Sequence, residues 1–207
     1  VTLEALKEMH LTPEDIQLIQ NDTKTCPDTG MAGASRSLYM DGNATIIAAN
    51  KLLAAMRKED GTLRTYDEMK AEGIETKYLG RYETNTTPGL CRLDPNTGIG
   101  DPTPAFTYCL NLAEVEVDTK TGKTTVLKFT CVDFVGRIGN IDAVNGQAYS
   151  GIMHGIGFAL KEDYADVKKH ANMFGAGTSY IKDVPDDIDL IHIDGAISDG
   201  PFGSSGA

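Results

Sequence analysis

The residues of this chain best suited to binding chemistry form a loop over residues 26–36, which reads C-P-D-T-G-M-A-G-A-S-R. Gly30 and Gly33 leave the backbone uncovered, and Asp28 and Thr29 are residue types that cap helix N-termini. A bare loop that leads into a helix presents free N–H groups and the positive end of the helix dipole. The stretch therefore predicts a site for an anion, typically a phosphate, although a well-capped tight turn would give the same pattern.

Two more stretches of small residues have the same character. Gly146 and Gln147 form the junction between a predicted loop and a predicted helix over residues 147–163, and residues 200–207 read G-P-F-G-S-S-G-A. Each stretch could offer N–H groups to an anion, and three such junctions could surround a large one. The predicted helix also holds glycines that each cost ~1 kcal/mol relative to alanine, so we expect a ligand or a helix to approach it closely. These glycines are Gly151, Gly155 and Gly157.

The remaining polar residues predict no further site. The histidines lack the spacing of metal ligands, and the acidic residues around Pro185 lack the periodicity of a calcium loop. The cysteines show no C-x-x-C spacing, which argues against zinc and against a small disulfide scaffold. We therefore expect reduced thiols, a cytoplasmic protein and no metal held by side chains. The histidines are His10, His154, His170 and His192, and the cysteines are Cys26, Cys91, Cys109 and Cys131.

Composition restricts the class of protein. The 207 residues are 41% hydrophobic and 24% charged, which are values of a globular protein. A formal net charge of -11 argues against a nucleic-acid surface, which needs clustered lysine and arginine. No run approaches 18 consecutive apolar residues, so we expect no membrane-spanning helix.

Hydrophobic periodicity predicts an α+β fold with small mixed sheets and two long helices, which are the elements that must position the three loops. The two long helices are predicted over residues 38–56 and 147–163, the latter after a loop over residues 135–146. Shorter helices are predicted over residues 2–10, 13–15 and 66–71, and a long loop over residues 86–104. Strands are predicted over residues 16–20, 76–84, 106–118, 124–134 and 188–193, with a hairpin loop over residues 119–123.

Four motifs in this order resemble the molybdenum hydroxylases, the family of aldehyde oxidoreductases and xanthine dehydrogenases. They read N-D-T…P-D-T-G-x-A-G-A-S-R, V-D-x-x-x-x-x-G-N, N-G-Q-x-x-x-G-x-x-x-G-x-G and G-P-F-G-S-S-G-A. The first is similar to the bacterial aldehyde oxidoreductase branch. The resemblance covers nearly the whole chain and corresponds to the C-terminal part of the molybdopterin-binding subunit.

The resemblance implies which residues contact the cofactor. The first loop would contact its pyrophosphate and pterin, a glutamine would make a polar contact, and the last loop would lie beside the metal. Ser35 as a donor and Arg36 as a fixed positive charge agree with this role, whereas a capping role is the alternative for Gln147. The implied contacts are Thr29, Gly30, Met31, Ala32, Gly33, Ala34, Ser35, Arg36, Gln147, Gly203, Ser204, Ser205 and Gly206.

The resemblance also implies that residues 1–207 are a fragment of one molybdopterin-binding domain, truncated at both ends. The family's catalytic glutamate would align just past Ala207, and two earlier cofactor loops would lie upstream of Val1. We therefore expect no catalytic residue on this chain and an inactive isolated chain.

For the intact enzyme, the resemblance implies oxidation of aldehydes to carboxylic acids with oxygen from water, on molybdenum and molybdopterin cytosine dinucleotide. The implied partners are the remaining molybdopterin-binding segments, an iron–sulfur subunit or domain, an optional FAD subunit and a small-molecule substrate, without nucleic acid or membrane. A purine or nicotinate-type N-heterocycle hydroxylase is one alternative. A non-catalytic subunit that completes a partner's cofactor site and an unrelated nucleotide-binding module are the others.

Overall fold

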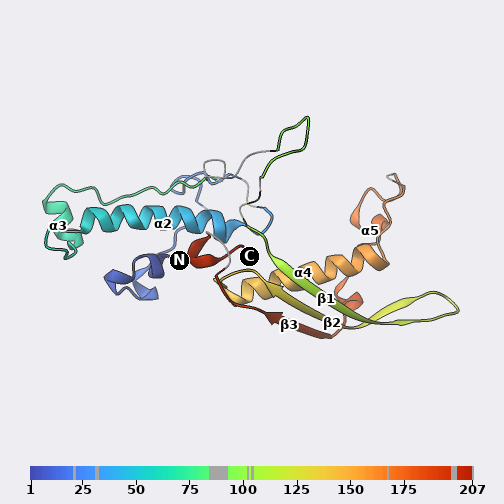
Figure 1. Cartoon of the computed structure of the whole chain (residues 1–207). Helices are drawn as coiled ribbons and strands as arrows, with labels where there is room; N and C mark the ends of the chain where they lie inside the picture. Colours follow the sequence, from blue (N-terminus) through green and yellow to red (C-terminus); the bar gives the residue numbers. More distant parts are fainter. Residues whose placement is uncertain are drawn as a thin grey trace. The chain divides into compact units, whose positions relative to one another are not determined.

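The computed structural model describes residues 1–20, 22–30, 33–83, 93–101, 103, 105–166, 168–196 and 200–206 (Figure 1). They form two compact units, residues 1–106 with 196–206 and residues 107–195. No helix in the described ranges has the length and apolar character needed to cross a membrane.

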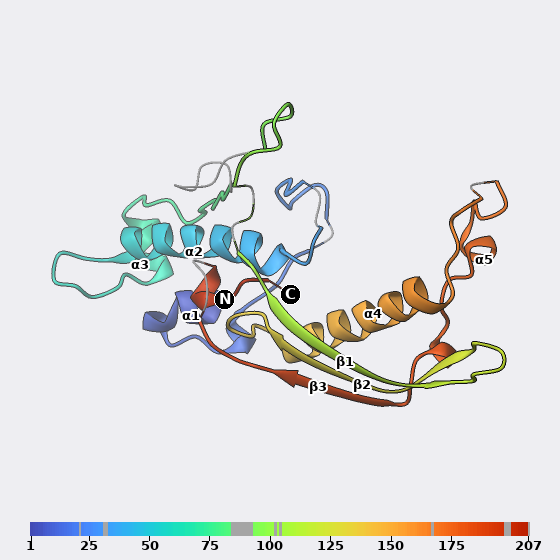
Figure 2. The same ribbon diagram turned by 45° about the vertical axis from the view of Figure 1, so that its right-hand side comes forward.

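The first unit is built around α2 (Ser37–Met56), with α1 (Thr2–Ala5) packed against it and α3 (Tyr66–Ala71) following its C-terminal end (Figure 2). α2 carries small residues, among them Gly42, Ala44 and Ala48, at the points where other parts of the chain come very close. A Cβ atom on Gly80 would lie 1.7 Å from the carbonyl oxygen of Ala44, which only glycine permits. The segment around Gly80 therefore lies directly on α2.

The last described residues also pack on α2. The short 3-10 helix η5 (Pro201–Gly203) contacts it, and a Cβ atom on Gly42 would lie 2.4 Å from Cγ of Pro201. A Cβ atom on Gly200 would lie 2.7 Å from the ring of Tyr39, which is 1% exposed. Close packing of small residues thus fixes the last loop against the first turns of α2.

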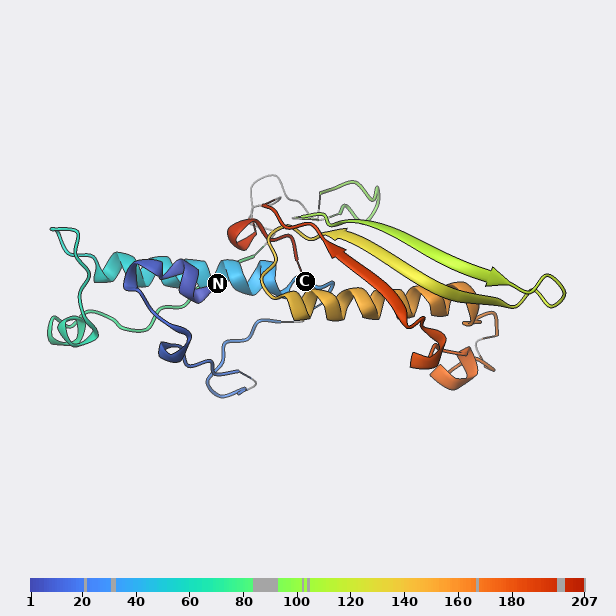
Figure 3. The same ribbon diagram turned by 90° about the horizontal axis from the view of Figure 1, so that it is seen from below.

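The second unit is a three-stranded sheet of order β1-β2-β3 with one long helix. β1 (Tyr108–Val117) and β2 (Thr124–Phe134) form an antiparallel hairpin, whereas β3 (Asp187–His192) lies parallel to β2. The helix α4 (Ile141–Leu160) connects β2 to β3 and runs along one face of the sheet (Figure 3). Its Ile152 and Ile156 pack on Cys131 of β2, with Val126, Phe129, Ile188 and Leu190 around them.

Most predicted elements are confirmed, and the α+β class with a mixed sheet and two long helices is correct. The prediction for α4 is wrong at its start, because the helix begins at Ile141 rather than at residue 147. The predicted strands over residues 16–20 and 76–83 are not strands. Neither has a sheet neighbour: Leu18 and Ile19 are exposed, and residues 76–83 follow α2 instead. Part of the predicted loop over residues 86–104, like Thr84, lies outside the described residues, and the described part of that loop forms no helix or strand.

Candidate functional site

The first predicted loop combines exposed backbone with an unusual conformation. Gly30 has φ +70, and its N–H donates to Oδ1 of Asp28 at 2.9 Å. Ala34 and Ser35, which both carry a Cβ atom, have φ values of 56 and 51, in the left-handed region. Each such residue costs about 1–3 kcal/mol, and such strain concentrates where a ligand is held. Met31 and Ala32 lie outside the described residues.

The helix that follows this loop begins without a side-chain cap. Arg36 occupies the N-cap position, makes no side-chain hydrogen bond to the first turn, and is exposed. The first turn also contains no acidic residue. The N–H groups of a helix N-terminus carry partial positive charge, so an uncapped end next to an exposed arginine favours an anion.

The last predicted loop lies beside this end of α2. A Cβ atom on Gly206 would lie 3.0 Å from the backbone oxygen of Ser35, so these two residues of the first and last loops lie next to each other within the first unit. Gly203, Ser204 and Gly206 are buried, whereas Ser205 is half-buried. Among the described side chains, the Ser205 hydroxyl is one of three buried polar groups without a hydrogen-bond partner. An unpaired buried hydroxyl is costly, and a polar ligand would relieve that cost.

A groove of about 830 Å³ lies next to the same loop, between α2 and residues 78–83. Its charged lining residues are Asp28, Asp41, Glu83 and Arg81, and the last two pair with each other at 2.5 Å. The lining is therefore net acidic, which disfavours a phosphate. An anion is better placed at the N-terminus of α2 than in this groove.

Gln147 belongs to the second unit, and the structure corrects the setting predicted for it. Gly146 and Gln147 lie inside α4, not at a loop-to-helix junction. The helix is capped by Asn140, whose side-chain oxygen accepts from the N–H groups of Asp142 at 3.0 Å and Ala143 at 3.1 Å. Gln147 is exposed on the second turn of α4, where its backbone belongs to the helix, so a ligand would contact its side chain rather than its backbone.

A buried polar network near Gln147 was not predicted. Nδ1 of His192 on β3 lies 2.6 Å from Oδ1 of Asp133 on β2, and its Nε2 lies 2.6 Å from Oδ1 of Asn145 on α4. The side chains of His192 and Asp133 are only 8% and 11% exposed. The network thus ties β2, β3 and α4 together, two residues before Gln147. A sequence signal existed only for Asp133 and Asn145, which fall within motifs.

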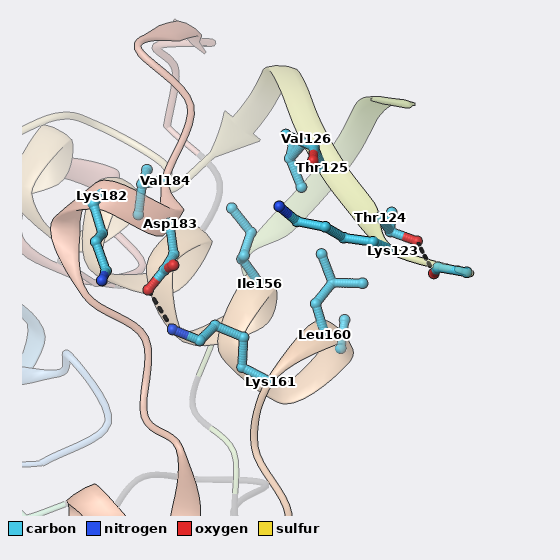
Figure 4. A pocket seen from close by; sticks show the side chains of 12 residues that line it. Lys123, Thr124, Thr125, Val126, Ile156, Leu160, Lys161, Lys182, Asp183 and Val184 are labelled. Atoms are coloured by element: carbon cyan, nitrogen blue, oxygen red, sulfur yellow. Dashed lines mark hydrogen bonds and ion pairs between the residues drawn. The ribbon is translucent and has the colours of Figure 1, made fainter. Parts of the chain in front are cut away.

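A second pocket, of about 520 Å³, lies at the other end of α4 between the β1–β2 hairpin and residues 182–184 (Figure 4). Lys161 points at Asp183, and their charged atoms lie 2.5 Å apart. The hydrogen bond from Lys161 lowers the pKa of the Asp183 carboxyl group. None of the predicted contact residues lines this pocket. Among the described residues, no group of three histidine, cysteine or acidic side chains could hold a metal ion.

Comparison with known proteins gives consistent matches. A family model described as a molybdopterin cofactor-binding domain matches residues 2–185. The chain is 42% identical over 203 residues to the aldehyde oxidoreductase of Megalodesulfovibrio gigas, covering 98% of this chain and 22% of that protein. It is 28% identical over 219 residues to a probable hypoxanthine oxidase of Escherichia coli K12, covering 99% of this chain and 23% of that protein.

A solved structure agrees with these matches. The aldehyde oxidoreductase from Desulfovibrio desulfuricans superposes with a TM-score of 0.87 at 45% identity, covering 99% of this chain and 22% of that chain. The present chain therefore spans about a fifth of the length of the relatives it matches.

Proposed function

This chain belongs to the molybdenum hydroxylases, within their molybdopterin cofactor-binding domain, and from that membership we propose that it forms part of the cofactor site of an aldehyde-oxidising enzyme. The observation that supports the proposal best is the contact between Gly206 and the backbone of Ser35, because it joins two predicted loops at the uncapped end of α2. The identity of 42% to one aldehyde oxidoreductase, against 28% to a probable hypoxanthine oxidase, favours aldehydes over purines.

The residues present fit a large anionic cofactor. We propose that the backbone of residues 29–36 and the guanidinium of Arg36 hold its phosphates, in the cytosine dinucleotide form. In the same proposal, residues 203–206 approach its pterin end, where the Ser205 hydroxyl lacks a protein partner. As the family resemblance implies, we propose that the Gln147 side chain makes one polar contact to the cofactor. When bound, the cofactor supplies two-electron redox chemistry at molybdenum.

The proposed contact residues bind and orient but do not transfer protons. They are glycine, alanine, methionine, serine, threonine, glutamine and arginine, and none of these side chains is a general base at neutral pH. Proton abstraction during turnover therefore falls to another residue. We also propose that iron–sulfur clusters and FAD on other domains or subunits carry electrons away.

The test measures molybdenum and released cytidine monophosphate per chain in the complete enzyme. Gly206→Ala places a Cβ atom against Ser35, and we expect at least a tenfold loss of both, equivalent to about 1.4 kcal/mol or more of binding. Gly122→Ala is the matched control, because Gly122 also has a positive φ and a Cβ atom there meets open space in the β1–β2 turn. Equal molybdenum content in the two variants would contradict the proposed site. For the isolated chain we expect little cofactor and no aldehyde oxidation.

A further inference from the structure

We propose that Cys109 and Cys131 form a modification site, in which the exposed thiol of Cys109 captures an oxidised low-molecular-weight thiol and Cys131 resolves it into an intramolecular disulfide. This site lies on the sheet of the second unit and does not depend on the proposed cofactor function. The ligand class is a small symmetric disulfide, such as oxidised glutathione.

The geometry of the two strands brings these thiols together. Cys109 of β1 lies opposite Asp133, and Cys131 of β2 lies opposite Asn111, so the cysteines are diagonal neighbours on one face of the antiparallel pair. Their Sγ atoms are 3.7 Å apart, close enough for one thiol to donate a hydrogen bond to the other. Because side chains alternate across a strand, neither sulfur can move to the other face, and the two remain neighbours.

The two thiols differ in what can reach them. Cys109 is exposed, whereas Cys131 is only 5% exposed and packs with Ile152 and Ile156 beneath α4. A reagent from solvent therefore meets Cys109 first. Burial, together with the neighbouring thiol, raises the pKa of Cys131 to about 12, so its thiolate is scarce at neutral pH. Direct attack by Cys131 on a solvent reagent is disfavoured for both reasons.

The reaction balances in two exchange steps. The Cys109 thiolate attacks one sulfur of oxidised glutathione, forms a mixed disulfide and releases one glutathione thiolate. Cys131 then loses its proton to solvent and attacks the Cys109 sulfur, forming the Cys109–Cys131 bond and expelling the second glutathione. The two protein thiols lose two electrons and two protons in all, and oxidised glutathione gains the electrons.

The position of the pair predicts how stable the product is. Diagonal neighbours have Cα atoms about 7–8 Å apart, at or beyond the upper end of the span that a disulfide bridges without backbone movement. We therefore expect a bond that forms under oxidation and is reduced more easily than an unstrained structural disulfide. Because Cys131 is part of the cluster under α4, bond formation also changes the packing of that helix.

The experiment uses the full chain with Cys26→Ser and Cys91→Ser, so that only the pair can react. The reduced protein is treated with oxidised glutathione, quenched with an alkylating reagent and analysed by intact and peptide mass spectrometry. We expect a transient glutathione adduct on Cys109, followed by a product two hydrogen atoms lighter than the starting protein and linked between Cys109 and Cys131.

Two further variants make each outcome decisive. With Cys131→Ser we expect the adduct on Cys109 to persist, and with Cys109→Ser we expect adduct formation at least tenfold slower. Circular dichroism confirms that each variant is folded. The proposal would be overturned if, in the protein that keeps both Cys109 and Cys131, the glutathione adduct on Cys109 persisted and Cys131 still reacted with the alkylating reagent. Equal modification rates of the two single variants would overturn it as well.

Discussion

The two long helices of this protein begin in opposite ways. α2 follows two left-handed residues, Ala34 and Ser35, and no side chain caps its first turn. α4 begins at Asn140, whose side chain accepts hydrogen bonds from two N–H groups of the first turn. The free N–H groups of a helix end are what an anion binds, so a helix that caps itself has less to offer.

This difference separates two ways of contacting a cofactor. α2 offers backbone and partial charge at its end, and the loop that precedes it is exposed and strained at Ala34 and Ser35. α4 offers the Gln147 side chain from its second turn, and the His192 network holds that turn to the sheet. Backbone binding suits phosphates of any orientation, whereas a single side chain on a fixed helix can contact one atom selectively.

The largest expected effect concerns the network behind α4. His192→Ala leaves the nearly buried Asp133 carboxylate without its partner, and we expect the free energy of unfolding to fall by about 3 kcal/mol. Urea denaturation measures this loss. The control is His154→Ala, an exposed position on α4, for which we expect a change within about 0.5 kcal/mol. Similar losses in both variants would show that the network does not hold α4.

An intermediate effect distinguishes the two helix starts directly. Asn140→Ala removes a cap, and we expect it to lower the free energy of unfolding by about 1 kcal/mol. Arg36→Ala removes no cap and should change stability by less than about 0.5 kcal/mol. Chemical denaturation of the two variants gives both values.

For the molybdenum content of the complete enzyme, we expect the opposite ranking: Arg36→Ala should have the larger effect and Asn140→Ala the smaller. Arg36→Ala should lower the content several-fold, because a fixed positive charge is lost at the proposed anion site. Asn140→Ala should leave it within about twofold. A loss of cofactor in both variants, or in neither, would remove the distinction between the two helix ends.

The sequence predicted elements well where the signals were local. β2 and α3 begin and end where predicted, and α3 starts at a capping box formed by Thr65 and Glu68. α4 was placed six residues late because Gly146 was taken as the end of a loop. Asn140, a good N-cap residue, was the better signal for the start of that helix.

Features that depend on distant residues could not be predicted in the same way. A strand needs a partner, and nothing in residues 16–20 shows whether one exists. His192 was set aside because its spacing to the other histidines is unlike that of metal ligands, yet it hydrogen-bonds to residues on two other elements. The loop over residues 29–36 was recognisable from residue types alone, but its contact with Gly206 arises only from packing on α2.

The smallest expected effect concerns α3, which caps its own first turn as α4 does, but with a side chain that titrates. Glu68 accepts a hydrogen bond from the N–H of Thr65 at 2.7 Å and pairs with Lys58 at 2.7 Å. The Lys58 hydrogen bond, followed by that of Thr65, lowers the pKa of Glu68 from 4.5 to about 2. A carboxyl group with a depressed folded-state pKa stabilises the fold above its unfolded pKa and loses that contribution as the pH falls through the folded value.

Fraying of α3 should therefore increase between pH 4.5 and about 2, whereas the cap of α4 should not respond because the Asn140 amide does not titrate. Amide hydrogen exchange in the first turn of each helix, corrected for intrinsic rates, measures this difference. Glu68→Gln serves as the control, because it should remove the pH dependence at α3 and leave α4 unchanged. If the first turns of α3 and α4 lost protection together as the pH fell, general acid unfolding rather than a titrating cap would be responsible.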